Sequence, residues 1–388
     1  MHSFVKIMRE ALGEFRMRTK RILLASPTMH GEEMKYIQEA FDTNWIAPLG
    51  KNVDSFEQEI CDYIGGGYAA ALTSCTAALH MALKLCKLKR DEVVLCSDLT
   101  FSASVNPVSY EGGRQVFIDS DYETWNMDPA ALEKAFEKYP EARVVIVANL
   151  YGTPARLNEI RAICDEHHAV LIEDAAESLS ATYCGRQTGT FGDYNALSFN
   201  GNKIITSSGG GMLLSRDEAA VKKVRFWATQ AKDPAPYYQH SEIGYNYRMS
   251  NIVAGIGRGQ LLHLEEHRKL KKEIYERYRN AFAELPLTMN PHLACSEPNY
   301  WLSCILLDKE VSVDPFEIMK RLDAHNIDSR PTWKPMHLQP VFADRDFITV
   351  NNLPVSEEIF SRGLCLPSDI KMTEDEQNEV IAIVKSFF

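Results

Sequence analysis

Short apolar runs rich in β-branched residues recur along the first half of the chain, and stretches with helical periodicity separate them. Each run is too short for a buried helix and has the composition of a buried strand. Strands joined by helices in this way form a parallel sheet with helices on both faces. The sequence therefore predicts an α/β fold, whose ligands bind at the carboxyl ends of the strands. The runs lie at residues 68–73, 93–96, 116–118, 144–148 and 170–172.

The chain becomes strongly charged after Gly259, which indicates a domain boundary there. A long charged helix begins there and ends at Pro286. A smaller α+β region follows, with a strand at 301–307 and a closing helix capped by Thr373, which has Glu376 three residues on. Other helices are predicted at 31–42, 77–85 and 157–167 and from Asp314 onward. We predict an N-terminal extension at 1–20, a large domain at 21–258 and a small domain at 259–388.

The charge balance excludes some partners. The chain has 388 residues, of which 42 are basic and 53 acidic, and its formal net charge is −11. Binding to a polyanion needs clustered Lys and Arg, so we expect no nucleic-acid partner. No stretch approaches the about 20 apolar residues of a membrane span. The first twenty residues are amphipathic and basic but lack a signal peptide's apolar core and cleavage site.

The cysteines indicate a reducing compartment. There are nine, with no C-x-x-C pair and no metal-ligand spacing. Cys86, Cys96 and Cys164 lie in apolar surroundings and are predicted to be small buried hydrophobes, not parts of a disulfide framework. We therefore predict a cytoplasmic protein.

Three segments carry residue types that do chemistry. The first is Ser74-Cys75-Thr76-Ala77, at a strand-to-helix turn, where hydroxyls and free backbone N–H groups can hold a phosphate. Taken alone, it is also an ordinary N-cap. The second ends the strand at 170–172 with three carboxylates in six residues, of which Asp174 falls at the strand end. A carboxylate there suits a buried cationic partner, although acids also decorate helix N-termini without any function.

The third segment, residues 197–211, contains one lysine, Lys203, among apolar and small residues. A desolvated lysine becomes a nucleophilic amine and suits a Schiff base, whereas most lysines are simply solvated. Considered together, the three segments provide what pyridoxal phosphate needs: a phosphate anchor, a partner for the pyridine nitrogen and an amine for the aldehyde.

The chain also resembles a known family. The segments TSCTAALH, EDAAES, SFNGNKIITSSGGGM and GYNYRMSN occur in the order found in the DegT-type (DegT/DnrJ/StrS) sugar-nucleotide aminotransferases of pyridoxal phosphate fold type I. The resemblance covers about residues 22–388. It implies a large domain with a mostly parallel, seven-stranded-type sheet flanked by helices, and a smaller α+β lobe.

The resemblance assigns roles residue by residue. It implies that Lys203 carries the cofactor and moves the proton, and that Asp174 keeps the pyridine nitrogen protonated. Asn246 would reach the phosphate in a neighbouring subunit, which implies a homodimer with shared sites. Asn149 stands where many relatives have His. The remaining implied cofactor contacts are Thr76, Ala77, Phe101, Glu177 and Ser198.

Within this family, the segments NWIAPLG, FNGNKIIT and RPTWKPMH are most similar to aminotransferases of bacillosamine-type pathways. These transfer an amino group from L-glutamate to C4 of a UDP-linked 4-keto-6-deoxy-N-acetylhexosamine. By the same resemblance the residues lining the sugar-nucleotide site would be Trp45, Ala47, Pro48, Tyr247, Arg248, Trp333, Lys334 and His337.

Alternative functions follow from the same residues. A sugar dehydratase of this fold replaces the lysine by histidine, and a non-catalytic regulator would have lost Lys203 or Asp174; both residues are present. Another nucleotide-linked 3- or 4-keto sugar, GDP- or dTDP-linked, remains an alternative substrate. The pattern His263-Leu264-Glu265-Glu266-His267 matches a zinc-protease motif. Because its helix is charged all round and no third ligand is evident, we predict no metal site.

Overall fold

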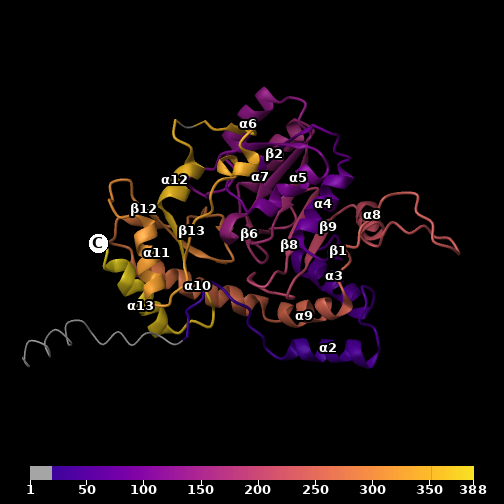
Figure 1. Cartoon of the computed structure of the whole chain (residues 1–388), viewed down its shortest axis with the longest axis horizontal. Coiled ribbons are helices and arrows are strands. Elements are labelled where there is room, and N and C mark those ends of the chain that lie inside the picture. Colours follow the sequence, from indigo (N-terminus) through magenta and orange to yellow (C-terminus); the bar gives the residue numbers. More distant parts are fainter. Residues whose placement is uncertain (1–19, 351) are drawn as a thin grey trace, which may run out of the picture.

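The computed structural model describes residues 20–350 and 352–388, so the predicted N-terminal extension lies outside the described residues except for Lys20. An eight-stranded sheet forms the centre of the larger part (Figure 1). Neighbouring strands are parallel except in the two pairs that involve β9. In sheet order the strands are β1 (Tyr68–Leu72), β9 (Gly211–Ser215), β8 (Tyr194–Ser198), β5 (Val170–Asp174), β4 (Val144–Ala148), β2 (Val93–Ser97), β3 (Arg114–Ile118) and β14 (Asp346–Ile348).

The predicted α/β class and mostly parallel sheet are confirmed. The sheet exceeds the seven-stranded type by β14, which the C-terminal part of the chain adds beside β3. Ile348 is 6% exposed and packs on the sheet core, so this short segment covers the edge of β3. A strand of this length with a polar first residue has no clear apolar run, and the sequence analysis did not identify it.

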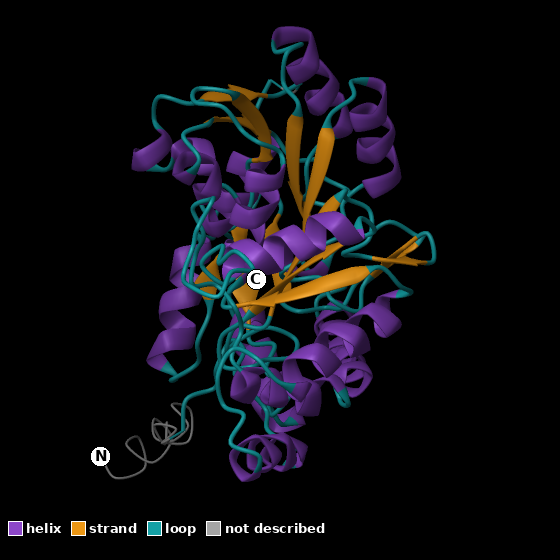
Figure 2. Cartoon of the chain, turned by 90° about the vertical axis from the view of Figure 1, so that its right-hand side faces the viewer, coloured by secondary structure: helices purple, strands orange, loops and turns teal. Residues whose placement is uncertain are grey.

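Helices cover both faces of the sheet, as Figures 1 and 2 show. Along β2, Val94 and Cys96 face α4, whereas Leu95 faces α6 and α7, because successive side chains of a strand point to opposite faces. A third core cluster joins α3 and α9 to β1 and β9. The helices of this part are α2 (Glu32–Asp42), α3 (Lys51–Ile64), α4 (Cys75–Leu85), α5 (Asn106–Tyr110), α6 (Pro129–Lys138), α7 (Leu157–Glu166), α8 (Glu218–Ala228) and α9 (Asn251–Leu261).

The C-terminal part contains a four-stranded antiparallel sheet in the order β10-β12-β15-β13. The helix predicted from Asp314 onward is present, with Asp314 accepting from the Phe316 N–H group, and the predicted cap Thr373 forms a capping box with Glu376. The elements are α10 (Leu264–Ala281), β10 (Leu287–Met289), β12 (Ser303–Leu307), α11 (Pro315–Ala324), β13 (Arg330–Pro331), α12 (Val355–Arg362), β15 (Gly363–Leu366) and α13 (Glu374–Lys385).

A small three-stranded sheet links the two parts, because β11 (Ser296–Glu297) pairs with β6 (Thr182–Tyr183), which pairs with β7 (Arg186–Gln187). The cysteines Cys86, Cys96 and Cys164 are buried, as expected. Within residues 20–350 and 352–388, no helix is long and apolar enough to cross a membrane.

Glycines of α9 bring α2 and α3 close to it. A Cβ atom on Gly257 would lie 2.6 Å from the ring of Phe56. On Gly259 it would lie 2.6 Å from the backbone nitrogen of Glu33 and 2.7 Å from its Cα atom. Alanine is otherwise the better helix residue, so these glycines serve the packing of α9 and not its helical propensity.

We predict that Gly259→Ala lowers the free energy of unfolding by about 1–3 kcal/mol, because the backbone of α2 must move to admit the methyl group. Urea unfolding of both proteins measures the difference. Gly201→Ala is the matched control, since its Cβ atom would come no nearer than 3.9 Å to a neighbour. Equal stability of Gly259→Ala and the parent would contradict this account of the packing.

Candidate active site

A cavity of about 310 Å³ opens where β1, β5 and β8 end. β1, β5 and β8 run in the same direction in one sheet. Their carboxyl ends therefore lie at one edge and bring together segments that are far apart in the sequence. The predicted site residues that line this cavity are Thr76, Phe101, Asp174, Glu177, Ser198, Lys203 and Trp333.

Asp174 is the last residue of β5 and is 6% exposed. The Ser104 hydroxyl donates to its Oδ2 atom at 2.6 Å, and the Ala176 N–H group donates to Oδ1 at 3.0 Å. The Cys75 thiol lies 3.7 Å from Oδ1, and burial raises the pKa of that thiol well above its usual range, so it is a neutral donor. These contacts hold the carboxylate in one orientation with an edge toward the cavity.

Lys203 reaches the cavity from the loop between β8 and β9, and its side chain is 12% exposed. Its Nζ atom lies 3.5 Å from Glu177 Oε1 and 4.1 Å from the centre of the Trp301 ring. No acid is near Lys203 in sequence, so this ion pair could not be read from the chain. The other Glu177 oxygen accepts from the Tyr151 N–H group at 2.7 Å. Burial raises the pKa of Glu177 to about 7, although the Lys203 ammonium opposes the shift.

The N-terminus of α4 faces the cavity opposite this pair. Ser74 caps the helix and accepts from the Ala77 N–H group at 3.1 Å. Gly211 allows β9 to run against this turn, because a Cβ atom there would lie 2.2 Å from the Cys75 nitrogen. Thr76 and Ser198, which both carry hydroxyls, also line the cavity. Ala77 is outside the lining set, and its role in cofactor binding stays a prediction.

Aromatic residues from the C-terminal part close one side. Trp333 packs against Phe101 with 5.4 Å between ring centres, and the backbone N–H group of Trp333 donates to the Tyr151 hydroxyl at 2.9 Å. The Trp301 indole donates to the Asn202 carbonyl at 2.7 Å, beside Lys203. Phe101 is 56% exposed, so a ring face is free to stack on a planar ligand.

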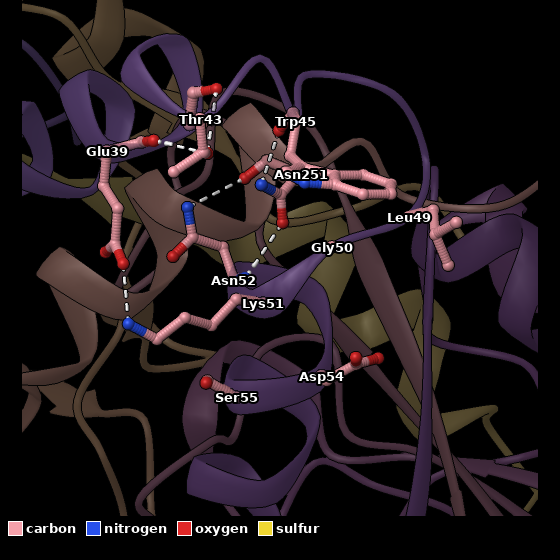
Figure 3. Close-up of a pocket in the computed structure, with 11 residues that line it drawn as sticks. Glu39, Thr43, Trp45, Leu49, Gly50, Lys51, Asn52, Asp54, Ser55 and Asn251 are labelled. Carbon is pink, nitrogen blue, oxygen red and sulfur yellow. Dashed lines mark hydrogen bonds and ion pairs between the residues drawn. The ribbon is translucent and has the colours of Figure 1, made fainter.

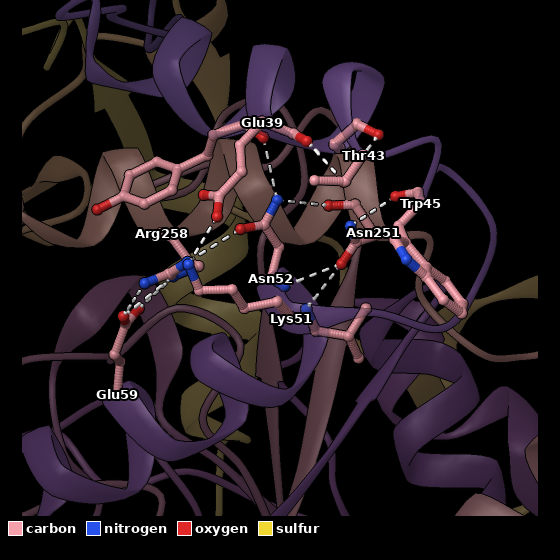
Figure 4. A network of polar contacts seen from close by, with 11 residues as sticks. Glu39, Thr43, Trp45, Lys51, Asn52, Glu59, Asn251 and Arg258 are labelled. Atoms are coloured by element: carbon pink, nitrogen blue, oxygen red, sulfur yellow. Dashed lines mark hydrogen bonds and ion pairs between the residues drawn. The ribbon is translucent and has the colours of Figure 1, made fainter.

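The loop with Trp45, Ala47 and Pro48 is fixed elsewhere, over a second cavity of about 660 Å³ beside α2 and α3 (Figure 3). The side chain of Asn251 donates to the Trp45 carbonyl at 2.6 Å, and its backbone N–H group donates to the Ala47 carbonyl at 2.9 Å. Arg258 braces the same region, donating to Glu59 at 2.6 Å and to Asn52 at 2.9 Å (Figure 4).

The other predicted substrate contacts also lie outside the lining of the first cavity, so their roles stay predictions. Arg248 forms an ion pair with the buried Glu57 and donates to the Ala71 carbonyl at 2.8 Å. His337 lies 2.8 Å from Asp98 through Nδ1, and Lys334 and Asn246 are exposed. Tyr247 stacks on Tyr245 with 5.0 Å between ring centres.

The sequence analysis missed Ser104 and Trp301 as site residues. Ser104 stands in the segment DLTFSAS, already noted for Phe101, so its position offered a signal. Trp301 comes from a different part of the chain, and nothing in its local sequence indicates contact with Lys203. Asn149, where relatives have His, donates to Glu173 at 2.8 Å and so braces the end of β5 from outside the cavity lining.

A buried carboxylate, an amine and the start of a helix meet at one cavity beside the strand ends of an α/β sheet, which is the arrangement that a pyridoxal phosphate-dependent aminotransferase needs. The model of the DegT/DnrJ/EryC1/StrS aminotransferase family matches residues 27–385. The chain belongs to this family.

Individual relatives and solved structures support the same family assignment. EpsN of Bacillus subtilis, named as a pyridoxal phosphate-dependent aminotransferase, is 48% identical over 95% of this chain and 96% of its own. The GDP-perosamine synthase of Caulobacter vibrioides is 35% identical over 93% of this chain and 97% of its own. A DegT/DnrJ/EryC1/StrS aminotransferase from Brucella abortus has a TM-score of 0.85 at 26% identity, covering 92% of this chain and 95% of its own. The predicted family, enzyme class and cofactor are confirmed.

The donor set fits pyridoxal phosphate. Asp174 suits the pyridine nitrogen, the Lys203 amine suits the aldehyde carbon, and the Thr76 and Ser198 hydroxyls with the start of α4 suit the phosphate. When bound, the cofactor supplies an electron sink for a carbanion at the amino-acid α carbon. A protonated ring nitrogen strengthens that sink, and a carboxylate held as Asp174 is favours this protonation.

The contacts around Lys203 suit the proton-carrying role that the family resemblance predicts for it. Trp301 and Glu177 confine its amine to one region of the cavity. Once the amine is free, Nζ can accept a proton from a bound amino acid and return it to a neighbouring atom. The aromatic side formed by Trp301 and Trp333 keeps bulk water from that position.

We predict that Glu177 makes stability depend on pH. Because its pKa is raised from 4.5 to about 7 in the folded chain, its stabilising contribution is complete below pH 4.5 and is lost as pH rises through about 7. The melting temperature of cofactor-free parent protein, relative to Glu177→Gln, should fall over this window. The glutamine is neutral and can still accept from Tyr151. Parallel curves of melting temperature against pH would contradict the assignment.

Proposed function

We propose that this enzyme transfers an amino group from L-glutamate to C4 of a UDP-linked 4-keto-6-deoxy-N-acetylhexosamine. The product would be a UDP-2-acetamido-4-amino-2,4,6-trideoxyhexose. The observation that carries the transaminase chemistry is the single cavity that brings together Lys203, Asp174 and the start of α4. The UDP-linked substrate rests on the similarity of the segments at 44–50 and 330–337 to enzymes of bacillosamine-type pathways.

A second candidate acceptor is a GDP-linked 4-keto sugar. GDP-perosamine synthases of Caulobacter vibrioides, Vibrio cholerae and Escherichia coli O157:H7 are 35%, 32% and 30% identical to this chain. These relatives match most of the length of the chain, which supports a GDP-linked acceptor as the alternative.

The reaction would run in two halves. L-Glutamate enters and leaves as 2-oxoglutarate, and the keto sugar then enters and leaves as the amine. Lys203 moves the proton in both halves, and Asp174 keeps the pyridine nitrogen protonated in both. One cavity must therefore admit a small amino acid and a large nucleotide sugar in turn, which an open mouth beside the exposed Phe101 permits.

We further propose a cytoplasmic homodimer with shared sites. The loop between α8 and α9 projects from the body of the molecule (Figure 1). It carries Tyr237, Tyr238 and Ile243, which are 66%, 82% and 79% exposed, and the exposed Asn246 follows them. A second copy would cover these apolar side chains. Asn246 would then reach the cofactor phosphate in the partner's cavity.

We predict that the purified enzyme absorbs visible light with its cofactor bound, and that L-glutamate bleaches the band. A keto sugar that is a substrate should restore it, so UDP-, GDP- and dTDP-linked 4-keto sugars can be compared by the rate of return. Asp174→Asn should retain the cofactor but slow bleaching by about 100-fold or more, because the ring nitrogen loses its anionic partner. A protein that stays colourless with added pyridoxal phosphate and intact Lys203 would overturn the proposal.

Shared sites predict a specific complementation. Lys203→Ala and Asn246→Ala homodimers should each be defective at limiting cofactor. A mixed dimer contains one cavity with both original residues and one with neither, so its activity should be about half that of the parent dimer. Activity of tagged and purified mixed dimers gives the answer. A mixed dimer with only about half the activity of the Asn246→Ala homodimer would show that Asn246 does not serve the partner's site.

A further inference from the structure

A cluster of histidines and glutamates lies outside the active site, where the segment before α2 meets the start of α10. His30 precedes α2 and Glu32 is its first residue, whereas His263 is the N-cap residue of α10 and Glu266 and His267 lie in its first turn. The rings of His30 and His263 stack with 3.6 Å between their centres. His263 contacts both acids, with Nδ1 at 3.0 Å from Glu266 and Nε2 at 3.2 Å from Glu32.

The pattern at 263–267 predicts no metal site because no third ligand is evident in the sequence. In the structure, His30 lies beside His263 and Glu266, although more than two hundred residues separate it from them in the sequence. Ligand atoms of His30, His263 and Glu266 all lie within 4.8 Å of one another. Zinc bound to nitrogen and oxygen at about 2.0–2.2 Å needs tetrahedral ligand atoms about 3.4 Å apart. The His30 and His263 rings are stacked nearly parallel, and a ring nitrogen's lone pair lies in the ring plane. One of these partly exposed rings must therefore rotate, and His263 must give up a contact with Glu266 or Glu32, before both rings can bind one ion.

His267 is placed to orient the cluster, not to bind directly. It is 3% exposed, its Nδ1 atom lies 2.7 Å from the Ile204 carbonyl, and its Nε2 atom lies 2.7 Å from His30 Nε2. Because the carbonyl can only accept, Nδ1 carries the proton and the neutral ring accepts from His30 at Nε2. When His30 is neutral, its remaining nitrogen, Nδ1, carries the lone pair and can bind a metal. Metal-bound histidines typically donate their second nitrogen in this way.

The backbone around His30 is also held in place. The Glu33 carboxylate accepts from the N–H groups of His30 at 3.2 Å and Gly31 at 2.7 Å. Gln260 donates to the same carboxylate at 2.6 Å and ties it to α9. A ligand on a fixed backbone loses less conformational entropy when it binds, which favours affinity.

We propose that His30, His263 and Glu266 form a binding site for a borderline divalent metal such as Zn²⁺, with Glu32 or water completing the coordination. Imidazole nitrogens with one carboxylate select zinc and its neighbours over Mg²⁺ or Ca²⁺, which prefer oxygen ligands. The site connects the chain before α2 to α10. Through His267 it also contacts Ile204, the residue after Lys203, so a bound metal would brace the loop that carries the active-site lysine.

The test is the binding of Zn²⁺ alone to the cofactor-loaded enzyme by isothermal titration calorimetry, so its outcome is independent of transaminase activity. We expect one zinc per chain for the parent. His263→Gln and His30→Gln should weaken binding at least about tenfold. Glu266→Gln changes an exposed side chain and should also weaken binding without affecting folding. His168→Asn replaces an exposed histidine elsewhere, suits its positive φ of 54°, and should bind as the parent does.

Rival ligands are the exposed thiols of Cys184 and Cys295. The variant Cys184→Ser/Cys295→Ser should keep the site. Equal zinc binding by the parent and all three cluster variants would overturn the proposal, as would loss of binding in the cysteine variant alone. Absence of zinc binding to the parent would overturn it as well, and would leave the proposed transaminase function untouched.

Discussion

The carboxylate of Asp174 is the constraint on which the active site depends. It is nearly buried at the end of β5, so its charge needs partners, and Ser104, Ala176 and Cys75 provide them. These partners come from the turn after β5, the start of α4 and the segment before α5. The contacts of this one carboxylate therefore fix three segments relative to one another, and the same segments line the cavity.

The second requirement is that both parts of the chain contribute to one cavity. Lys203 lies on the loop between β8 and β9, but the ring beneath its amine is Trp301, which precedes β12 in the C-terminal part. Trp333 adds a further ring, fixed by the Tyr151 hydroxyl of the larger part. Loss of the contact between the two parts would therefore expose Lys203 to water and release its restraint. Packing between the parts is in this sense part of the chemistry.

Most of the fold and the central site could be predicted from local signals. The strands at 144–148 and 170–172 are apolar runs, and the capping box at Thr373 is a short-range motif. The ordered motifs predicted Asp174, which ends β5, and Lys203, which lies in the loop after β8. Contacts such as Lys203 with Glu177 could not be predicted, since they depend on how turns meet in space.

The same limit explains two other misses. β14 has too few residues for an apolar pattern, and it forms because the edge of β3 is available to pair with it. The contact of His30 with His263 could not be predicted, because it depends on how α9 packs against α2 at Gly259. Local motifs thus locate the residues at the ends of elements, whereas pairings between distant segments follow from packing.

The net charge of −11 constrains how the protein can bind a phosphate group. A phosphate-binding enzyme with an acidic surface cannot rely on a broad positive field to hold its ligand. The start of α4 offers oriented N–H groups and the hydroxyls of Thr76 and Ser198 instead. Such donors act only at contact distance, so they bind a phosphate that fits the cavity and leave a polyanion at the surface unbound. The acidic excess and the phosphate site are therefore compatible, and together they favour small phosphorylated ligands over nucleic acid.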